Sequence, residues 1–276
     1  MIYLDYQATT PLAPEAFEAM VPLLRDQFAN PHSAHRAGRA AAAQVEVARD
    51  EIARLLPPGG RLIFTSGATE ALNIAIQGAP PGGIVTIATE HAAVLDTAEA
   101  MRRQGRDVTI LPVDGDGLVD MDAARAVIRP GVALVAAMLV NNEIGVIQPT
   151  AALARLAREA GALFLCDAVQ GYGRVPMPDG CDMIAISAHK IHGPKGVGGL
   201  WLRDGVRPSH RSSAPCFPTG RSTAAPPTAT PAISTCGVTE STARVCCLIA
   251  AMLLFRSAAL AQAGPGGLAM CCARWG

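Results

Sequence analysis

The stretch Met183-Ile-Ala-Ile-Ser-Ala-His-Lys-Ile-His-Gly-Pro-Lys-Gly-Val-Gly-Gly-Leu-Trp-Leu202 decides the expected fold of this chain. Two short apolar runs, each typical of a buried strand, flank a loop punctuated by glycine and proline. The loop holds both lysines of the chain, Lys190 and Lys195, although Lys and Arg together number 23. Arginine stays protonated in proteins, whereas a partly desolvated lysine can lose its proton and form a Schiff base with a carbonyl. The pattern therefore predicts a strand-loop-strand unit that presents a reactive amine; the alternative is a surface loop with two basic residues.

Outward from this stretch, short apolar runs alternate with helix-sized segments up to about residue 205. The runs that predict buried strands are Leu62–Thr65, Ile84–Ala88, Val108–Leu111, Val132–Val140, Leu163–Cys166, Met183–Ile186 and Gly199–Leu202. The segments that predict helices are Ala40–Leu56, Glu70–Gln77, Ala92–Arg103, Met121–Val127 and Ala151–Ala160. Strands joined in sequence by helical crossovers form a mostly parallel sheet with helices on both faces, so the expected fold class is α/β.

Composition narrows the classes of function. The chain has 276 residues, half of them hydrophobic, and a formal net charge of zero. Because the sequence has no run of basic residues, it predicts no positively charged surface that would attract nucleic acid or an anionic membrane. The first residues lack the basic and apolar regions of a secretory signal, and the first 200 residues contain no apolar run of about 20 residues. We expect a cytoplasmic protein that acts on a small molecule, with no nucleic-acid or membrane partner.

The sequence pattern changes near residue 205. We expect residues 1–205 to form one domain, with residues 1–14 as an N-terminal arm, and residues 206–276 to form an irregular tail. The segment Pro208–Thr235 is dense in Pro, Ser, Thr and Ala, and Glu240 is the sole acid after residue 204. Six of the eight cysteines lie in this tail, but their spacing suits neither zinc nor a disulfide framework, so no metal site is expected. Our hypothesis is that the tail is unselected sequence, such as sequence translated out of the original frame.

An anion-binding turn is expected at Thr65-Ser-Gly-Ala-Thr-Glu-Ala71, which follows a predicted strand and opens a predicted helix. Backbone N–H groups near Gly67–Glu70 would point outward at the positive end of the helix dipole, which suits a phosphate group. The alternative is a simple capping turn, since Ser and Thr are common before helices.

Other polar side chains follow predicted strands at their carboxyl ends, where ligands bind in open α/β sheets. Asp167 can hold a protonated ring nitrogen, and Gln170 can reach the same ligand; the alternative for Asp167 is a helix cap. His91 can stack on an aromatic ligand and move protons near neutral pH, although a lone histidine is often structural. The amides of Asn141 and Asn142 can orient a substrate carboxylate or satisfy a turn.

In this order, the motifs resemble those of the cysteine desulfurases of the NifS/IscS type, in the class V aminotransferase group of pyridoxal-phosphate enzymes. The resemblance covers residues 1 to about 205. The motifs that carry it are Tyr3-Leu-Asp-Tyr-Gln-Ala-Thr-Thr-Pro11, Ser66-Gly-Ala-Thr-Glu70, Thr89-Glu-His91, Val140-Asn-Asn-Glu-Ile-Gly145, Cys166-Asp-Ala-Val-Gln170 and Ser187-Ala-His-Lys-Ile-His-Gly-Pro-Lys-Gly-Val-Gly198. It implies the large domain of a fold type I pyridoxal-phosphate-dependent transferase.

The resemblance also implies roles for these residues. Lys190 would bind pyridoxal 5'-phosphate covalently and then move the Cα proton of the substrate. Asp167 would pair with the pyridine nitrogen, and Gln170 with the phenolic oxygen. Thr69, the backbone of Ala68, Ser187 and His189 would hold the phosphate. His91 would stack over the ring and assist proton transfer, and Asn142 would lie near the ring and the substrate carboxylate. The catalytic residues would thus be Lys190 and His91.

The implied reaction converts L-cysteine to L-alanine and passes the sulfur to an acceptor, in a homodimer that can serve a sulfur-acceptor protein, as in iron-sulfur cluster assembly. Three later family features have no counterpart in this chain: the loop bearing the attacking cysteine, the arginine for the substrate carboxylate, and an Arg-Ser-Gly-Thr stretch. Cys216 and Cys236 lack the flanking pattern. We therefore expect the chain to bind the cofactor weakly or not at all and to have little desulfurase activity. The alternatives are another class V enzyme, such as a selenocysteine lyase or an aminotransferase, and a non-catalytic remnant.

Overall fold

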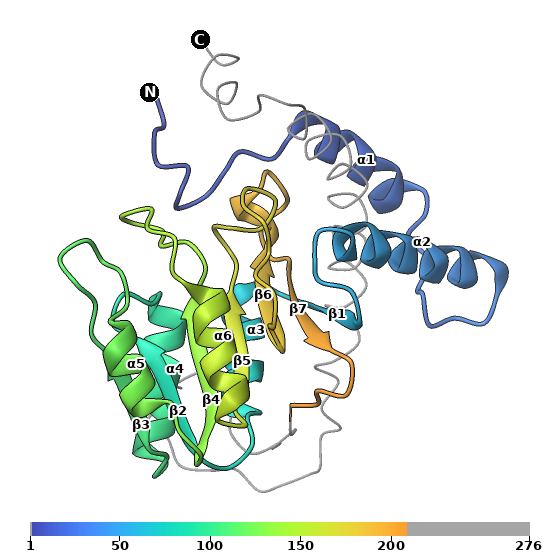
Figure 1. Cartoon of the computed structure of the whole chain (residues 1–276). Helices are drawn as coiled ribbons and strands as arrows, with labels where there is room; N and C mark the ends of the chain where they lie inside the picture. The colour runs from blue at the N-terminus through green and yellow to red at the C-terminus, as the bar shows by residue number, and fades with distance from the viewer. Residues whose placement is uncertain (1, 209–276) are drawn as a thin grey trace, which may run out of the picture.

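The computed structural model describes residues 2–208, which form a seven-stranded sheet flanked by helices (Figure 1). The strands are β1 (Gly60–Thr65), β2 (Gly83–Ile87), β3 (Val108–Leu111), β4 (Val132–Met138), β5 (Leu163–Asp167), β6 (Met183–Ser187) and β7 (Gly198–Arg203). The helices are α1 (Pro14–Arg25), α2 (Arg36–Ala53), α3 (Ala68–Gln77), α4 (Ala92–Arg103), α5 (Met121–Val127), α6 (Thr150–Glu159) and the 3₁₀ turn η1 (Ala188–Lys190). The predicted α/β class is confirmed.

The strand order is β1-β7-β6-β5-β4-β2-β3. Neighbours from β6 through β5, β4 and β2 to β3 pair in parallel, whereas β7 runs antiparallel to both β6 and β1. Because β7 opposes both neighbours, β1 points the same way as β6. The carboxyl ends of β1, β2, β4, β5 and β6 therefore lie along one edge of the sheet. The order also reverses between β2 and β4, which is the kind of point where open α/β sheets bind ligands.

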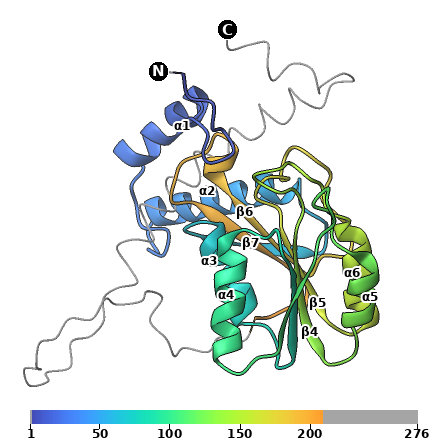
Figure 2. The same ribbon diagram turned by 90° about the vertical axis from the view of Figure 1, so that its left-hand side faces the viewer.

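Helices cover both faces of the sheet (Figure 2). In that view α3 and α4 lie on one side of the strands, and α5 and α6 lie on the other. Successive side chains of β4 point to opposite layers, as the period of two in a strand requires. Leu134 and Ala136 pack with the α3 and α4 side, while Val135 and Ala137 pack with the opposite cluster.

The N-terminal region contains a helix that the sequence analysis did not predict. Helix α1 begins with proline at its first position, where the missing N–H costs nothing, and buries Ala16, Met20 and Leu23 on one face. A second proline inside it, Pro22, obscures the helical pattern. Helix α2 spans Arg36–Ala53 instead of the predicted Ala40–Leu56. It begins earlier because the Nδ1 atom of His35 accepts a hydrogen bond from the Gly38 N–H (3.2 Å) and caps its first turn.

The other predicted elements differ from the observed ones only at their ends. Helix α3 begins two residues before the predicted start, at Ala68, and β4 ends at Met138 rather than Val140. Beyond Met138 the chain turns, and Asn141 N–H bonds to the Val146 carbonyl (2.9 Å). The domain limits at residues 205 and 206 stay predictions, and the expected irregular tail lies almost entirely outside the described residues. No helix in residues 2–208 is long and apolar enough to cross a membrane.

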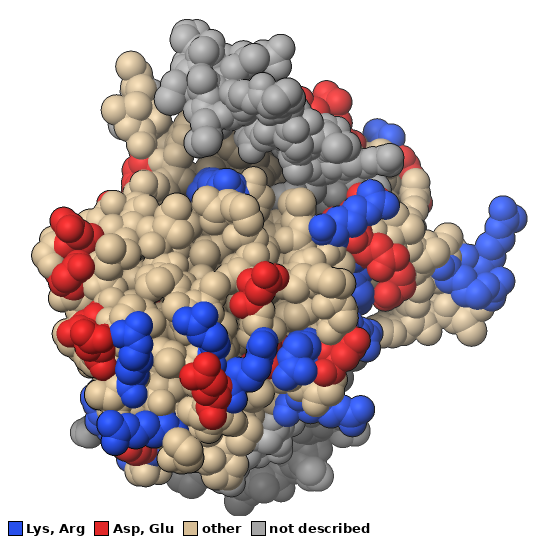
Figure 3. All heavy atoms as spheres, viewed as in Figure 1, with Lys and Arg blue, Asp and Glu red and all other residues tan. Residues whose placement is uncertain are grey.

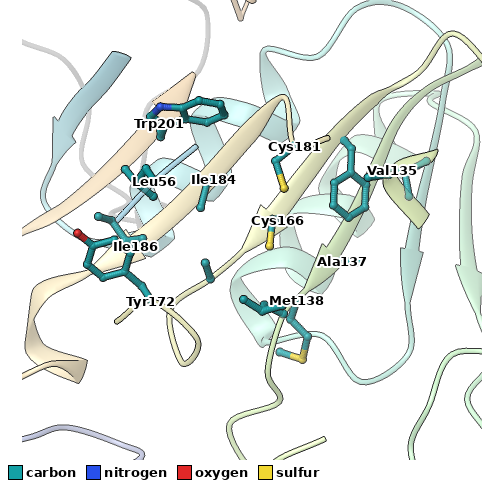
Figure 4. Packing of buried hydrophobic residues seen from close by; sticks show 14 of the residues in the cluster. Leu56, Val135, Ala137, Met138, Cys166, Tyr172, Cys181, Ile184, Ile186 and Trp201 are labelled. Atoms are coloured by element: carbon teal, nitrogen blue, oxygen red, sulfur yellow. The ribbon is translucent and has the colours of Figure 1, made fainter. Parts of the chain in front are cut away.

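The core on the α2 and α6 side of the sheet contains Trp201, Tyr172 and two cysteines (Figure 4). The Tyr172 hydroxyl donates a hydrogen bond to the Ile52 carbonyl (2.9 Å), which joins the turn after β5 to α2. Figure 4 shows the sulfur atoms of Cys166 and Cys181 among apolar side chains. Both cysteines are free and almost fully buried. The contact with Cys181 and burial raise the pKa of the Cys166 thiol, so this thiol stays protonated.

Candidate functional site

A cavity of about 620 Å³ opens at the carboxyl ends of the strands. Its volume is in the range of pockets that hold small organic ligands. Every site residue predicted from the sequence lines it: Ala68, Thr69, His91, Asn142, Asp167, Gln170, Ser187, His189 and Lys190. Lys195 lines it too. The structure thus brings together predicted residues that are up to 122 positions apart in the sequence.

The first turn of α3 forms one wall of the cavity. Its cap residue is Gly67, which has no side chain to bond the first N–H groups of the helix. The space beside it is open, since a Cβ atom at this position would meet nothing within 4 Å. The first N–H groups of a helix have no partner within the helix, so those of Ala68 and Thr69 are available to an anion. The side chain of Glu70 reaches back to the residue before the cap, where it accepts hydrogen bonds from Ser66 N–H (2.5 Å) and Ser66 Oγ (2.6 Å). The turn is therefore braced by Glu70 and open toward the cavity.

The loop that carries the two lysines packs closely against this turn. A Cβ atom on Gly198 would lie 2.5 Å from the Gly67 carbonyl carbon, so only glycine allows β7 to begin here. Ser187, at the end of β6, is 4% exposed, and His189 and Lys190 follow on η1. Burial and the positive charges of Lys190 and Lys195 lower the pKa of His189. Basic side chains and open N–H groups thus line the same cavity.

Asp167 lies at the end of β5 and is 6% exposed. Its Oδ1 accepts the Val169 N–H (3.0 Å), but no helix follows it before β6, so it caps a turn rather than a helix. Burial raises the pKa of Asp167, while the Val169 N–H, His91 and Lys190 act in the opposite direction. A cationic ring nitrogen would offset the cost of burying this carboxylate.

Glu90 is a buried acid that the sequence reasoning did not identify. Its Oε1 accepts the Met138 N–H (2.6 Å), whereas its Oε2 is buried without a hydrogen-bond partner among the described atoms. Burial and the nearby negative charge of Asp167 raise the pKa of Glu90 well above its ordinary value, against the effect of the Met138 N–H. Both effects favour the protonated form of Glu90, which reduces its charge repulsion with Asp167. Its place in Thr89-Glu-His91 was a sequence signal for it.

His91 precedes α4 and has both a structural contact and access to the cavity. Its Nδ1 accepts the Ala93 N–H (3.0 Å), so the neutral ring carries its proton on Nε2. This bond fixes the ring plane and its tautomer. Capping and a role at the cavity are therefore compatible, because they use different ring nitrogens.

The two neighbouring asparagines after β4 differ. Asn141 is buried and satisfies a turn: its Oδ1 accepts Glu143 N–H (2.8 Å) and Ile144 N–H (2.9 Å), and its Nδ2 donates to Thr89 O (2.8 Å). Asn142 lines the cavity. Of the alternatives left open by the sequence, the turn thus applies to Asn141, and Asn142 remains the candidate for ligand contact.

The N-terminal arm closes one side of the cavity, which the sequence did not predict. The Lys190 amine donates to the carbonyls of Gln7 (2.7 Å) and Ala8 (2.9 Å). Thr9 Oγ1 lies 3.1 Å from His189 Nδ1, and Thr10 Oγ1 donates to His189 O (2.9 Å). Burial lowers the pKa of Lys190, although the charges of Asp167 and Asp5 act against it. A lowered pKa gives the amine more of the neutral form that attacks carbonyls.

Gln170 is almost buried and uses both ends of its amide. Its Nε2 donates to the Gln7 carbonyl (2.9 Å), and its Oε1 accepts from Arg174 Nη1 (2.9 Å). The guanidinium also donates to the Lys190 carbonyl through Nη2 (2.6 Å). Arg174 is thus a further residue next to the site that no sequence motif singled out.

Acidic and basic side chains are interspersed on the face shown in Figure 3, without a large patch of one sign. Within residues 2–208 no group of three or more His, Cys, Asp or Glu side chains is arranged to hold a metal ion.

Comparison with known proteins agrees with this geometry. The model of the aminotransferase class-V family matches residues 2–222. A cysteine desulfurase of Cereibacter sphaeroides is 49% identical over 216 residues, which are 74% of this chain and 56% of that protein. The cysteine desulfurase IscS of Anaeromyxobacter dehalogenans is 45% identical over 213 residues, or 73% of this chain and 53% of its own length. The chain thus spans about half the length of these relatives.

Solved structures show the same fold. A NifS-like protein superposes with a TM-score of 0.77 at 31% identity and covers 95% of this chain and 71% of its own. The structure of SspA in complex with cysteine gives a TM-score of 0.74 at 32% identity, covering 92% of this chain and 72% of its own. The class V aminotransferases and the cysteine desulfurases depend on pyridoxal phosphate. By its sequence match and its fold, this chain belongs to the aminotransferase class-V family.

Proposed function

We propose that this chain forms the cofactor-binding part of a cysteine desulfurase-like, pyridoxal 5'-phosphate-dependent enzyme. The observation that carries the proposal is the placement of Lys190 and Asp167 on one cavity, with the open first turn of α3 in the same wall. A primary amine, a buried carboxylate and an anion-binding turn are the three groups that this cofactor requires for its aldehyde, its ring nitrogen and its phosphate.

The residues present fit the cofactor at both of its ends. At the phosphate end, the N–H groups of Ala68 and Thr69 would hold the phosphate oxygens, with the Thr69, Ser187 and His189 side chains around them. At the ring end, Asp167 would pair with the nitrogen and Gln170 with the phenolic oxygen. A buried acid with no cation in salt-bridge contact among the described residues is the kind of group that gains most from a cationic ligand.

Bound pyridoxal phosphate would withdraw electrons from the substrate Cα and so allow a bond at that carbon to break. Lys190 would hold the cofactor and, once released by the substrate amine, take and return the Cα proton. The lowered pKa of Lys190 suits both steps, because the amine must be neutral to accept a proton. His91 would stack over the ring and move a proton through Nε2, and Asn142 would orient the substrate carboxylate. In these roles Lys190 and His91 are the catalytic residues.

The described residues supply no thiol for the sulfur-transfer step. Within residues 2–208 the cysteines are Cys166 and Cys181, both buried in the core and neither on the cavity. Sulfur transfer needs an accessible thiolate, so this part of the chain should bind and activate L-cysteine but transfer sulfur poorly. The acceptor would be an external thiol or a sulfur-acceptor protein. We further propose a cytoplasmic location and, as in the family, a homodimer.

The test follows cofactor uptake and then the response to three amino acids. The purified chain is mixed with pyridoxal phosphate, and its absorbance is recorded before and after borohydride; L-cysteine, L-selenocysteine and L-alanine are then added separately. The proposal expects an adduct that borohydride reduction makes stable and a spectral change with L-cysteine. With dithiothreitol added as the reducing thiol that accepts the sulfur, it expects slow release of sulfide and alanine. A chain that takes up no cofactor at millimolar concentration would refute it. Faster turnover of selenocysteine than of cysteine would favour a selenocysteine lyase, and amino transfer from alanine an aminotransferase.

A further inference from the structure

The orientation of the Gln170 amide is set by a residue outside the predicted site. A guanidinium has only donors, so the amide atom 2.9 Å from Arg174 Nη1 must be the oxygen of Gln170. The amide nitrogen therefore points the other way, where it donates to the Gln7 carbonyl. Without Arg174, only the Gln7 carbonyl would hold the amide in this orientation, and the Gln170 oxygen would lose its charged donor.

The same guanidinium joins two separate segments of the site. Through Nη2 it donates to the backbone carbonyl of Lys190 (2.6 Å), and through Nη1 it also lies 3.3 Å from the Gln170 carbonyl. Gln170 follows β5 and Lys190 follows β6, so one planar group fixes the two segments relative to each other. Arginine suits this task because its rigid fork bonds several acceptors at once, which a single ammonium group cannot do with the same geometry.

We propose that Arg174 is a positioning residue of the cofactor site: it holds Gln170 as a hydrogen-bond donor toward the phenolic oxygen of the cofactor and fixes the backbone that carries Lys190. This inference rests on the proposed function. It adds a residue that touches neither cofactor nor substrate and acts through the two residues that do.

The first test needs no cofactor. In the ¹⁵N-labelled full chain, the side-chain amide signals of Gln170 are assigned by their loss in Gln170→Ala. In Arg174→Ala these signals should shift and exchange faster with water, because only the bond to Gln7 still holds the amide, while the dispersed backbone signals remain. Arg174→Lys should give an intermediate shift. Arg125→Ala, which removes an exposed arginine paired with Asp122 on α5, is the matched control and should leave the Gln170 signals unchanged. Unchanged Gln170 signals in Arg174→Ala would overturn the proposal.

The second test uses the pH dependence of the lysine-bound cofactor absorbance. A donated hydrogen bond stabilises the ionised phenolic oxygen, so Gln170→Ala and Arg174→Ala should each raise the midpoint pH, by roughly one to two units for the full loss of a bond to a charged group. The double variant should shift the midpoint by clearly less than the sum of the two single effects, because part of the effect of Arg174 passes through Gln170. Additive shifts would refute the positioning role. Failure of the unmutated chain to bind cofactor would instead count against the proposed function, and the amide signals would still decide the role of Arg174.

Discussion

The amine of Lys190 lies 2.7 Å from the carbonyl oxygen of Gln7, a residue 183 positions earlier in the chain. The carbonyl of Ala8 accepts a second hydrogen bond from the same amine (2.9 Å). The N-terminal arm thus holds the group that would bind the cofactor, and the same Gln7 carbonyl also accepts from Gln170. Cofactor attachment must replace these bonds, so the arm and the cofactor compete for one amine.

The two lysines of the chain allow a direct test of the amine. After incubation with pyridoxal phosphate and borohydride, peptide mass mapping should find the added mass on Lys190, because its pKa is lowered by burial. Lys190→Ala should abolish the stable adduct, whereas Lys195→Ala should keep it. Equal labelling of the two lysines would show that neither has the expected reactivity.

The arm should loosen when its main side-chain contact is removed. Thr10 is buried, and its hydroxyl donates to His189 O (2.9 Å) and accepts from His192 N–H (2.7 Å). Thr10→Val keeps the shape and the bond from the residue-10 N–H to His189 O (2.8 Å), but it leaves the His192 N–H unpaired, at a cost of about 1–3 kcal/mol. Hydrogen exchange should accelerate in residues 7–13 and in 189–193. Exchange that rises equally across the whole sheet would indicate global destabilisation instead of a loosened arm.

Asp167→Asn should weaken cofactor binding. Asparagine can still accept the Val169 N–H, so the turn should survive, but the charge that pairs with the ring nitrogen is lost. A hydrogen bond between charged groups contributes about 1.5–3 kcal/mol, so the Kd for pyridoxal phosphate should rise roughly ten- to hundredfold. Binding is measured by absorbance titration. Asp122→Asn, at an exposed position on α5, should bind like the unmutated chain.

Glu90 should make the folded protein less stable as the pH rises. Its folded-state pKa is raised, chiefly by burial, so the folded protein keeps a proton that the unfolded chain loses above its ordinary carboxyl pKa. The resulting stability is fully present below that ordinary value and is lost as the pH rises through the folded-state pKa. Glu90→Gln removes this loss.

Urea unfolding at pH 5 and pH 8 measures this effect. The decrease in unfolding free energy between the two values should be smaller in Glu90→Gln than in the unmutated chain, since Asp167 is common to both. Glu143→Gln, at an exposed position, should keep the original decrease. An identical decrease in all three would mean that Glu90 does not titrate differently in the folded state.

Tyr172 should contribute to stability through its hydroxyl. Tyr172→Phe removes this bond while the Ile52 carbonyl keeps the Leu55 N–H (3.2 Å), so the unfolding free energy should fall by about 0.5–1.5 kcal/mol. Burial also raises the pKa of Tyr172, so this phenol stays protonated at neutral pH. Tyr6→Phe, at a tyrosine that is 46% exposed, should change stability by no more than about 0.5 kcal/mol. Equal effects from the two substitutions would remove the special role of the buried hydrogen bond.

Much of the fold could be predicted from local patterns. The apolar runs and helical segments gave the strands to within two residues at their ends, and β3, α4 and α5 without error, because each element buries one side with its own period. The strand ends also identified the residues that line the cavity, since parallel strands bring their carboxyl ends to one edge. Helix α1 was missed because Pro22 interrupts its pattern.

The sequence by itself determined the α/β class, the family and the chemical groups of the candidate site, because these depend on residue types and short spacings. Only the tertiary structure decided how those groups are held. Three features each join separate segments or depend on burial: the hydrogen bond from Lys190 to the Gln7 carbonyl, the raised pKa of Glu90 beside Asp167, and the link from Arg174 to Gln170 and Lys190. Desolvation and contact between distant segments arise only when the chain is packed, so no local pattern in the sequence encodes them.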